Sequence, residues 1–400
     1  MSEMPSTNWA HALWSCETRS SFVNYQNMPK SSLLIIGPTP PPAQGVAVFT
    51  LALLRSNLRS SFRIVHLDTS DRRTLSNVGR LDFRNIVLAL RHGLQLQWLI
   101  LREQPDLIYM PVSAKTLGFL RDCLFLASAK LFRRRLVIHL HGGCLDSLYA
   151  KANSALRWLM RFCLGHATRA IVLGECFRQD FDGLLPRERI RVVPVGIAPG
   201  IWEASQEVAS GPKGGKIQIL YLGMLVESKG FWDLIRAVPY VLQETRDIEF
   251  RFVGDTSLPE AHEAKEWVRG HSLDPYVKFL GPKWGEEKTQ LLLEADIFAF
   301  PTWYPLEGQP AVVLEAMAAG LPIITTRHAT IPDMLGEEGA LYVRQRDPKD
   351  IAEKLCLLLR SEDVRRKMGL INQKRFVQCY TLERFSQNMR DAFVEALSNS

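Results

Sequence analysis

Two glutamates eight residues apart, Glu307 and Glu315, are the side chains whose type and spacing most clearly indicate binding chemistry. Glu307 stands in a loop containing Gly and Pro, whereas Glu315 stands in a run of good helix formers, so the two carboxylates are expected to have different roles. Ionised carboxylates only accept hydrogen bonds, and Glu315, about two turns into the expected helix, suits the two hydroxyls of a diol such as a ribose. Glu307 is expected nearer to the reacting group.

The short helix that carries the second glutamate has sequence signals at both ends. Gly320 followed by Leu-Pro is the Gly-then-Pro stop expected after a helix C-terminus. The start falls near Gly308 to Ala311, where free backbone N–H groups and the positive end of the helix dipole point outward. An anion such as a phosphate is therefore expected beside Gly308, Gln309 and Pro310.

Two histidines, His139 and His141, end another apolar run, so their imidazoles are expected on one face of a strand. His141 would lie at the carboxyl end of that strand, where open sheets bind ligands, and His139 is expected to be structural. A metal site is the alternative interpretation, because His-x-His is a ligand spacing and Cys144 and Asp146 follow closely. The sequence contains no second cluster of ligands, so no metal is expected.

Short apolar runs that alternate with helical stretches predict an α/β protein with parallel sheets covered on both faces. A first series ends near residue 197, residues 198–216 are rich in Gly, Ser and Pro, and a second series follows. We predict a flexible leader over 1–30, an N-terminal Rossmann-like domain over 31–200 and a C-terminal one over 210–376. The predicted strands are residues 32–38, 63–67, 106–112, 135–143, 169–174, 190–197, 217–223, 248–255, 277–282, 295–301 and 321–326.

The segment from Ala295 to Thr326, ADIFAFPTWYPLEGQPAVVLEAMAAGLPIITT, resembles the retaining glycosyltransferases of family 4, which bind their donor through a Glu-x7-Glu pair. The resemblance covers a whole strand, loop, helix and strand, so it is more specific than the pair alone. It implies the GT-B architecture, in which two Rossmann-like domains face one another across a cleft. It also implies that the C-terminal helix, about residues 377–400, packs back on the first domain.

The same resemblance implies roles for three catalytic candidates, Glu307, Lys229 and His141. Lys229, in the loop of YLGMLVESKGF, corresponds to the phosphate-gripping lysine and would neutralise the leaving diphosphate. His141 would hydrogen-bond the donor sugar or its anomeric phosphate. Family members usually carry an Arg where this chain has Met224, and Met offers a phosphate no charged contact.

Two further glycines and one substitution belong to the expected donor site. Gly45 follows PPPAQ at the place of the family's glycine-rich turn beneath the phosphate, and it permits close backbone approach to an oxyanion. Gly254 ends a later strand and would border the nucleotide base. Val195 stands where Asn is common in the family, which puts the role of that Asn in doubt.

Charge divides the chain into two unlike halves. Residues 1–200 hold 25 Lys and Arg against 13 Asp and Glu, a net +12, and the remaining residues hold 24 against 29, a net −5. Basic residues in KLFRRR, Lys130 to Arg135, and around Trp158 suggest either an anionic membrane surface or solvated helix faces. The sequence carries no recognisable nucleic-acid motif, no apolar run that predicts a membrane-spanning helix and no dinucleotide fingerprint. Seven scattered cysteines favour a reducing compartment.

We therefore expect a retaining glycosyltransferase that moves a sugar from a nucleoside-diphosphate sugar to a hydroxyl acceptor, without a cofactor or a metal. The acceptor is expected to be a lipid-linked or polysaccharide glycan, and the location cytoplasmic or peripheral at the inner membrane face. One alternative is a nucleotide-sugar epimerase or hydrolase of the same fold. Another is a glycosyltransferase-like binding protein without activity, which the residues Met224 and Val195 would favour.

Overall fold

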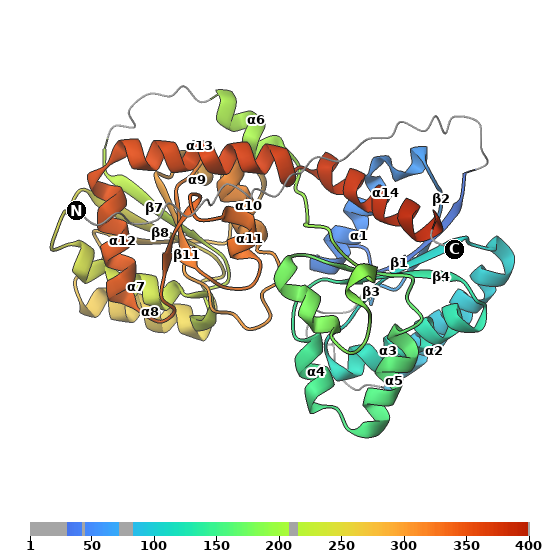
Figure 1. Ribbon diagram of the computed structural model, residues 1–400. Helices are drawn as coiled ribbons and strands as arrows, with labels where there is room; N and C mark the ends of the chain where they lie inside the picture. Colours follow the sequence, from blue (N-terminus) through green and yellow to red (C-terminus); the bar gives the residue numbers. More distant parts are fainter. Residues whose placement is uncertain (1–29, 42–44, 72–82, 208–214, 399–400) are drawn as a thin grey trace, which may run out of the picture. The chain divides into compact units, whose positions relative to one another are not determined.

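A computed structural model of the 400-residue chain describes residues 30–41, 45–71, 83–207 and 215–398. It contains two six-stranded sheets in which every pair of neighbouring strands is parallel (Figure 1). The first sheet has the order β2-β1-β3-β4-β5-β6 and the second has the order β12-β11-β10-β7-β8-β9. The predicted α/β fold is confirmed. The predicted leader, residues 1–30, lies almost wholly outside the described residues.

The first sheet and its helices are formed by the N-terminal half of the chain. Its strands are β1 Ser32–Gly37, β2 Arg63–Asp68, β3 Leu107–Val112, β4 Arg135–Leu140, β5 Arg169–Val172 and β6 Ile190–Val192. Its helices are α1 Gly45–Arg55, α2 Phe83–Glu103, α3 Thr116–Leu131, α4 Leu145–Lys151 and α5 Ser154–Leu164. The next helix, α6 Gly200–Glu207, packs through Ile201 and Trp202 on the core of the second sheet. Helix α6 lies inside the segment predicted as a linker, because IWEASQE has helix-forming residues between the flanking glycines.

The second sheet repeats the arrangement. Its strands are β7 Ile217–Leu222, β8 Ile248–Val253, β9 Val277–Gly281, β10 Ile297–Phe300, β11 Ile323–Thr326 and β12 Ala340–Val343. The helices are α7 Phe231–Val241, α8 Pro259–Gly270, α9 Gly285–Glu294, α10 Ala311–Ala318, α11 Ile331–Leu335, α12 Pro348–Arg360, α13 Glu362–Cys379 and α14 Leu382–Ser398. Strand β12 was not predicted, since ALYV is a four-residue run without strong boundary signals.

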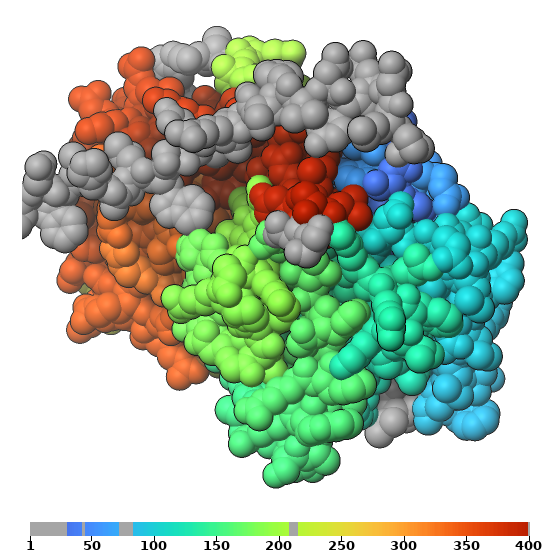
Figure 2. Space-filling model, turned by 45° about the vertical axis from the view of Figure 1, so that its right-hand side comes forward, coloured from blue at the N-terminus to red at the C-terminus, as the bar shows by residue number. Residues whose placement is uncertain are grey.

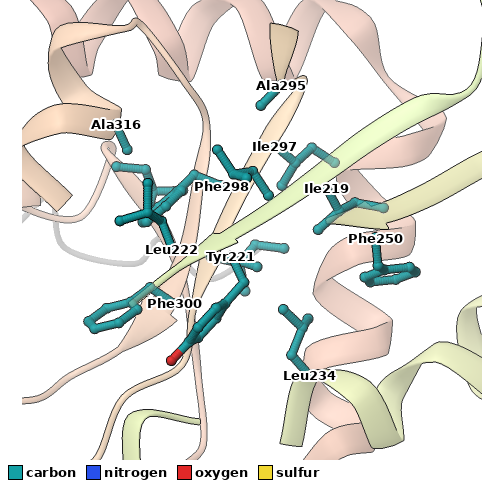
Figure 3. Close-up of a cluster of buried hydrophobic side chains, with 14 of the residues drawn as sticks. Ile219, Tyr221, Leu222, Leu234, Phe250, Ala295, Ile297, Phe298, Phe300 and Ala316 are labelled. Carbon is teal, nitrogen blue, oxygen red and sulfur yellow. The ribbon is translucent and has the colours of Figure 1, made fainter. Parts of the chain in front are cut away.

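Large aromatic side chains fill the core of the second sheet. Tyr221 on β7, Phe250 on β8 and Phe300 on β10 are all buried, and Figure 3 shows them together with the neighbouring aliphatic residues. The hydroxyl of Tyr221 donates to the carbonyl of Met224 over 2.8 Å, so its one polar atom is satisfied at the carboxyl end of β7. The core thereby fixes the turn that follows β7.

The last helix, α14, packs on the first sheet rather than the second. Phe385, Met389 and Phe393 are buried in one cluster with residues of β1, β3 and β4. The chain passes from α13 to α14 at Thr381, which forms an isolated parallel bridge with Ile197 just after β6. The two segments that join the sheets therefore run beside each other.

In both sheets the strand order reverses next to the first strand, between β1 and β3 and between β7 and β10. In an open parallel sheet, the loops at the carboxyl ends of two such strands diverge and leave a place for a ligand. The loop after β7 contains Lys229, and the loop after β10 contains Glu307. The fold thus brings two of the predicted catalytic residues to one end of the second sheet.

Helices α10 and α13 approach closely at two glycines. A Cβ atom on Gly369 would lie 2.0 Å from the carbonyl oxygen of Gly320, whose φ of +73° also favours glycine. Asn372, one turn further along α13, is buried and donates to the carbonyls of Leu321 and Gly339 over 2.9 and 2.8 Å. These contacts hold the C-terminal end of α10 in place.

We predict that Gly369→Ala lowers the free energy of unfolding by about 1–2 kcal/mol, because the backbone clash outweighs the helix-propensity gain of alanine. Urea denaturation followed by circular dichroism measures the change. Gly270→Ala, at the end of α8 where a Cβ meets nothing within 4 Å, is the matched control and is expected to unfold like the unchanged protein. Equal unfolding midpoints for Gly369→Ala and the unchanged protein would contradict the close approach.

Candidate active site

The centre of the candidate site is an ion pair between Lys229 and Glu307, whose Nζ and Oε2 atoms are 2.8 Å apart. The two side chains are only 12% and 8% exposed, so the pair is largely shielded from solvent. The hydroxyl of Thr302 donates to the same carboxylate oxygen over 3.2 Å, and the ammonium lies 4.4 Å from the centre of the Tyr304 ring. A charge-assisted hydrogen bond in such surroundings is strong and directional.

The turn that carries Lys229 is pressed against the end of β10. Gly230 has a φ of +79°, and a Cβ there would lie 2.1 Å from the carbonyl oxygen of Pro301. Only glycine fits this position, which explains the Lys-Gly sequence of the loop. Met224, the residue at the place where members of the resembled family usually carry Arg, lies earlier in the loop, and its side chain is half-exposed.

Helix α10 begins at Ala311, the last residue of the range Gly308 to Ala311 in which we predicted its start, and Pro310 is its extended N-cap residue. Glu315 is the fifth residue of the helix and therefore lies just over one turn from its start, not two turns as we expected. The overestimate arose because the predicted start included the extended residues Gly308 and Gln309, which have no helical turn of their own.

Glu315 has one bound and one unbound carboxylate oxygen. Its Oε1 accepts from the ammonium of Lys288, on α9, over 2.7 Å. Its Oε2 is buried, and no residue in the described part of the chain donates a hydrogen bond to it. A buried acceptor without a donor is costly, so this oxygen is well suited to receive a hydroxyl from a ligand.

Lys288 was not among the predicted site residues. It lies 27 positions before Glu315 and on a different helix, so no spacing in the sequence connects the two. Thr302 was likewise missed, although it is the second residue after β10 and precedes Glu307 by five positions. Residues at the carboxyl end of a parallel strand are where such a partner would be sought.

The loop before α10 contacts the end of β4. A Cβ on Gly308 would lie 2.7 Å from the carbonyl oxygen of His141, and the Gly308 carbonyl accepts from the hydroxyl of Thr330 over 2.9 Å. Gln309 uses both ends of its side-chain amide on the backbone of Val195, accepting from its N–H over 2.7 Å and donating to its carbonyl over 3.2 Å. Gln309 therefore anchors the loop, and it needs no particular side chain at position 195.

His141 is enclosed by other rings. Its imidazole stacks on that of His139 with a centroid separation of 4.0 Å, and Phe49 of α1 packs edge-on against it at 4.2 Å. The inner imidazole is tied to Tyr109, whose hydroxyl is 2.9 Å from Nδ1 of His139. Burial lowers the pKa of His141 to about 3, so its imidazole is neutral near pH 7. Its Nε2 atom is buried and has no hydrogen-bond partner in the described part of the chain.

The two remaining predicted glycines lie in different surroundings. Gly254 follows β8, and a Cβ there would lie 2.1 Å from the carbonyl oxygen of Gly223, so packing between the two turns already requires glycine. Gly45 begins α1, where a Cβ would meet nothing within 4 Å. Position 45 thus has room for a side chain or a ligand, and α1 links it to His141 through Phe49.

The described residues contain no group of three or more His, Cys, Asp and Glu side chains that could hold a metal ion. The His-x-His spacing is used instead for ring stacking, since His139 and His141 lie face to face. Among the cysteines that the structure describes, all six are free thiols.

Comparison with protein families assigns both sheets to glycosyltransferases. The model of a glycosyl transferase 4-like domain matches residues 41–196, and that of the glycosyl transferases group 1 matches residues 216–361. Among curated relatives, the phosphatidylinositol N-acetylglucosaminyltransferase GPI3 subunit of Saccharomyces cerevisiae is 25% identical over 266 residues, which are 64% of this chain and 55% of the relative. The amylovoran biosynthesis glycosyltransferase AmsK of Erwinia amylovora is 32% identical over 154 residues, 38% of this chain and 37% of AmsK.

The chain thus spans about half the length, or less, of these curated relatives. Solved structures match over nearly the whole chain. A glycosyltransferase from Rickettsia africae has a TM-score of 0.74 at 16% identity, covering 93% of this chain and 100% of that one. HepE from Anabaena, solved in complex with UDP, has a TM-score of 0.68 at 15% identity, covering 91% and 100%. The chain belongs to the group 1 glycosyltransferases of the family-4 type and has their GT-B fold.

Proposed function

We propose that this protein transfers a glycosyl group from a nucleoside-diphosphate sugar to a hydroxyl acceptor, with retention of the anomeric configuration. The observation that carries the proposal is the shielded Lys229–Glu307 pair at the point where the order of the second sheet reverses. Family membership supports it, as does the fact that a protein of the same fold, HepE, was solved with UDP. The described helices hold no candidate for a membrane span.

The proposed donor site extends from Glu315 to His141. Glu315 would accept the ribose hydroxyls through its unpartnered oxygen, with Lys288 holding the carboxylate in place. The N-terminus of α10 and the ammonium of Lys229 would face the diphosphate. Glu307 would hold hydroxyls of the sugar. An ammonium has three N–H donors, so Lys229 can contact a phosphate without releasing Glu307.

The reaction breaks the bond between the anomeric carbon and the phosphate oxygen and forms one to the acceptor oxygen. Negative charge develops on the departing diphosphate while positive charge develops at the anomeric carbon. Lys229 would stabilise the first charge and the Glu307 carboxylate the second. In the retaining course implied by the family, the acceptor attacks from the face that the phosphate leaves, and its proton passes to that phosphate. The chain needs no metal in this scheme.

His141 would contribute as a neutral hydrogen-bonding group. Its Nε2 atom faces no protein partner among the described residues, and its ring lies beside the loop of Gly308. Because burial lowers its pKa to about 3, it can contact the sugar or its anomeric phosphate without changing charge between pH 5 and 8. A neutral imidazole either donates or accepts at Nε2, depending on its tautomer.

The acceptor is proposed to be a glycan, either lipid-linked or part of a polysaccharide, at the cytoplasmic face of a membrane. The names of two relatives support this class, since one acts on phosphatidylinositol and the other is named for amylovoran biosynthesis. The positive net charge of the N-terminal half favours an acceptor with phosphate groups.

The first prediction concerns donor binding. The purified protein is expected to bind one of the UDP-, GDP- or ADP-sugars selectively, and Lys229→Ala is expected to weaken that binding about ten- to a hundredfold, because a charged hydrogen bond contributes roughly 1.5–3 kcal/mol. Isothermal titration measures the dissociation constants. Glu307→Ala is expected to lose turnover in addition to binding the donor more weakly. Lys367→Ala, which removes an exposed lysine of α13, is the control and is expected to bind the donor like the unchanged protein.

Each contrary outcome of this experiment selects another function. If no nucleotide sugar binds at millimolar concentration, the proposal is contradicted. The replacement of the family's usual Arg by Met224 would then indicate a protein without transferase activity. Donor binding without turnover would favour a binding protein. Release of free sugar, or its conversion without transfer, would favour a hydrolase or an epimerase.

The second prediction concerns the ribose. If Glu315 accepts ribose hydroxyls in a geometry set by Lys288, single substitutions Glu315→Ala and Lys288→Ala each weaken donor binding, and the double variant is weakened less than the sum of both. We expect a coupling energy of about 1 kcal/mol from binding titrations. A donor with a 2′-deoxyribose is expected to bind unchanged protein more weakly but to bind Glu315→Ala with little further loss. If the losses of binding free energy in the two single variants add up to the loss in the double variant, Lys288 does not act on the donor through Glu315.

The third prediction concerns pH. His141 has a lowered pKa, so the unfolded state takes up a proton as the pH falls below about 6.5 while the folded state stays neutral down to about pH 3. Its contribution to stability is therefore complete above pH 7 and is lost as the pH falls through this window. In His141→Phe, the free energy of unfolding is expected to decrease less steeply as the pH falls from 7 to 4 than it does in the unchanged protein. Urea titrations at each pH measure this free energy. A matching slope in both proteins would show that His141 is charged when folded.

A further inference from the structure

Helix α2 is apolar on two opposite faces. One face is buried against the first sheet through Leu96 and Ile100, together with His92 and Gly93. On the outer side, a row of large apolar side chains is 47–77% exposed: Phe83, Val87, Leu90, Leu94, Trp98 and Leu101. Single exposed apolar residues are ordinary in proteins, but a helix with a second, contiguous apolar face indicates a partner.

The spacing of this outer row is helical. Successive members lie four, three, four, four and three residues apart, so they form one stripe along the helix. The stripe extends over about 27 Å, given a rise of 1.5 Å per residue. Figure 2 shows this part of the chain, coloured cyan, on the surface of the molecule.

Exposed apolar residues on α3 and α5 broaden the stripe into a surface. Helix α2 packs against α3, and α3 packs against α5. Leu120, Leu124 and Leu131 are exposed on α3, and Trp158 and Phe162 are exposed and stacked on α5. Lys130 joins the last two helices, since its ammonium lies 3.4 Å from the centre of the Phe162 ring.

The charges of these three helices are almost all positive. Their sequences contain seven Arg and Lys residues and two acidic residues, a net +5. Of the two acids, Asp122 is buried, and Glu103 is bound by Arg63 at the far end of α2. Arg91 is exposed and follows Leu90 of the stripe, a position from which a long basic side chain reaches lipid headgroups. Arg102 pairs with Glu103 over 3.3 Å, and its guanidinium lies 4.8 Å from the centre of the Trp98 ring.

The basic cluster that the sequence first suggested, Lys130 to Arg135, has other roles in part. Arg134 donates to the carbonyl of Pro105 and contacts Gln104. Arg135 donates to the carbonyls of Ala396 and Leu397 at the end of α14. Substituting Arg135 would therefore disturb the packing of α14, and substituting Arg134 would disturb the loop at Gln104 and Pro105, so the three helices are a better surface for testing.

We propose that the outer faces of α2, α3 and α5 lie on an anionic lipid bilayer, with the stripe of α2 entering the boundary between headgroups and acyl chains. An apolar stripe with tryptophan and flanking arginines, on a helix that stays associated with a folded domain, has the chemistry of an interfacial helix. A protein partner would need acidic side chains placed opposite the individual arginines. The headgroups of an anionic bilayer present negative charge over the whole surface that the three helices would contact. The inference deepens the proposed function, and only its consequence for a lipid-linked acceptor rests on that function.

Vesicle flotation with the full chain tests this proposal without any nucleotide. The protein is expected to float with vesicles of phosphatidylcholine and 30% phosphatidylglycerol, and to bind pure phosphatidylcholine vesicles at least tenfold more weakly. The double variant Leu94→Ser, Trp98→Ser is expected to lower the partition coefficient for anionic vesicles at least tenfold. Arg91→Gln with Arg161→Gln is expected to reduce the preference for anionic vesicles and its sensitivity to salt.

Leu370→Ser, which removes an exposed leucine of α13, is the matched control and is expected to float like the unchanged protein. A circular dichroism spectrum and a urea unfolding midpoint equal to those of the unchanged protein verify that the Leu94→Ser, Trp98→Ser variant is folded. Two results would overturn the proposal: no flotation with either vesicle type, or equal flotation of the double variant. A dimer in sedimentation velocity that the same variant dissociates would also overturn it, because the stripe would then be an interface between copies. Since no donor is present, failure of the proposed transfer reaction leaves these results unaffected.

Discussion

The ion pair between Lys229 and Glu307 is the interaction on which the site depends. It joins the loop after β7 to the loop after β10, at the place where the order of the second sheet reverses. Removing one partner from a shielded pair leaves the other charge without compensation, so each residue constrains the other. In the proposed function, the ammonium would contact a phosphate and the carboxylate a sugar, and these two groups lie 2.8 Å apart. That separation suits a ligand whose phosphate and sugar are directly bonded.

Close backbone approach, rather than side-chain chemistry, positions the elements around this pair. Gly230 lies against Pro301, Gly308 against His141 and Gly369 against Gly320. In each case the facing carbonyl oxygen leaves no room for a Cβ atom. Gln309 then ties the loop before α10 to the backbone of Val195. The glycines of the site are thus explained by packing within the protein. Gly45 differs from the other predicted donor-site glycines, Gly254 and Gly308, because a Cβ there would meet nothing within 4 Å.

Sequence reasoning predicted the parts of the fold that depend on local patterns. The apolar strands follow from the runs of apolar residues, and a start of α10 between Gly308 and Ala311 follows from helix propensity and the Gly-Gln-Pro loop; the structure begins the helix at the last of these residues. Contacts between distant segments were not predictable. Lys288 reaches Glu315 from another helix, and Thr302 reaches Glu307 across a turn, and neither pair has a spacing that a single sequence reveals. The same limit applies to His141, whose neutrality arises from burial against the rings of Phe49 on α1 and His139 on β4.

The asymmetry of charge along the chain follows from the different surfaces of the two halves. In the C-terminal half, cations of the site are paired with carboxylates, as in Lys229 with Glu307 and Lys288 with Glu315, so they add little net charge. In the N-terminal half, the helices α2, α3 and α5 carry arginines without a matching number of acids, and these arginines border apolar side chains. Paired charges select a small ligand by geometry, whereas a net excess of positive charge attracts an extended anionic surface at long range. In the two proposals, the paired charges at the end of the second sheet would serve a small anionic ligand, and the net positive charge of α2, α3 and α5 would serve attachment to a surface.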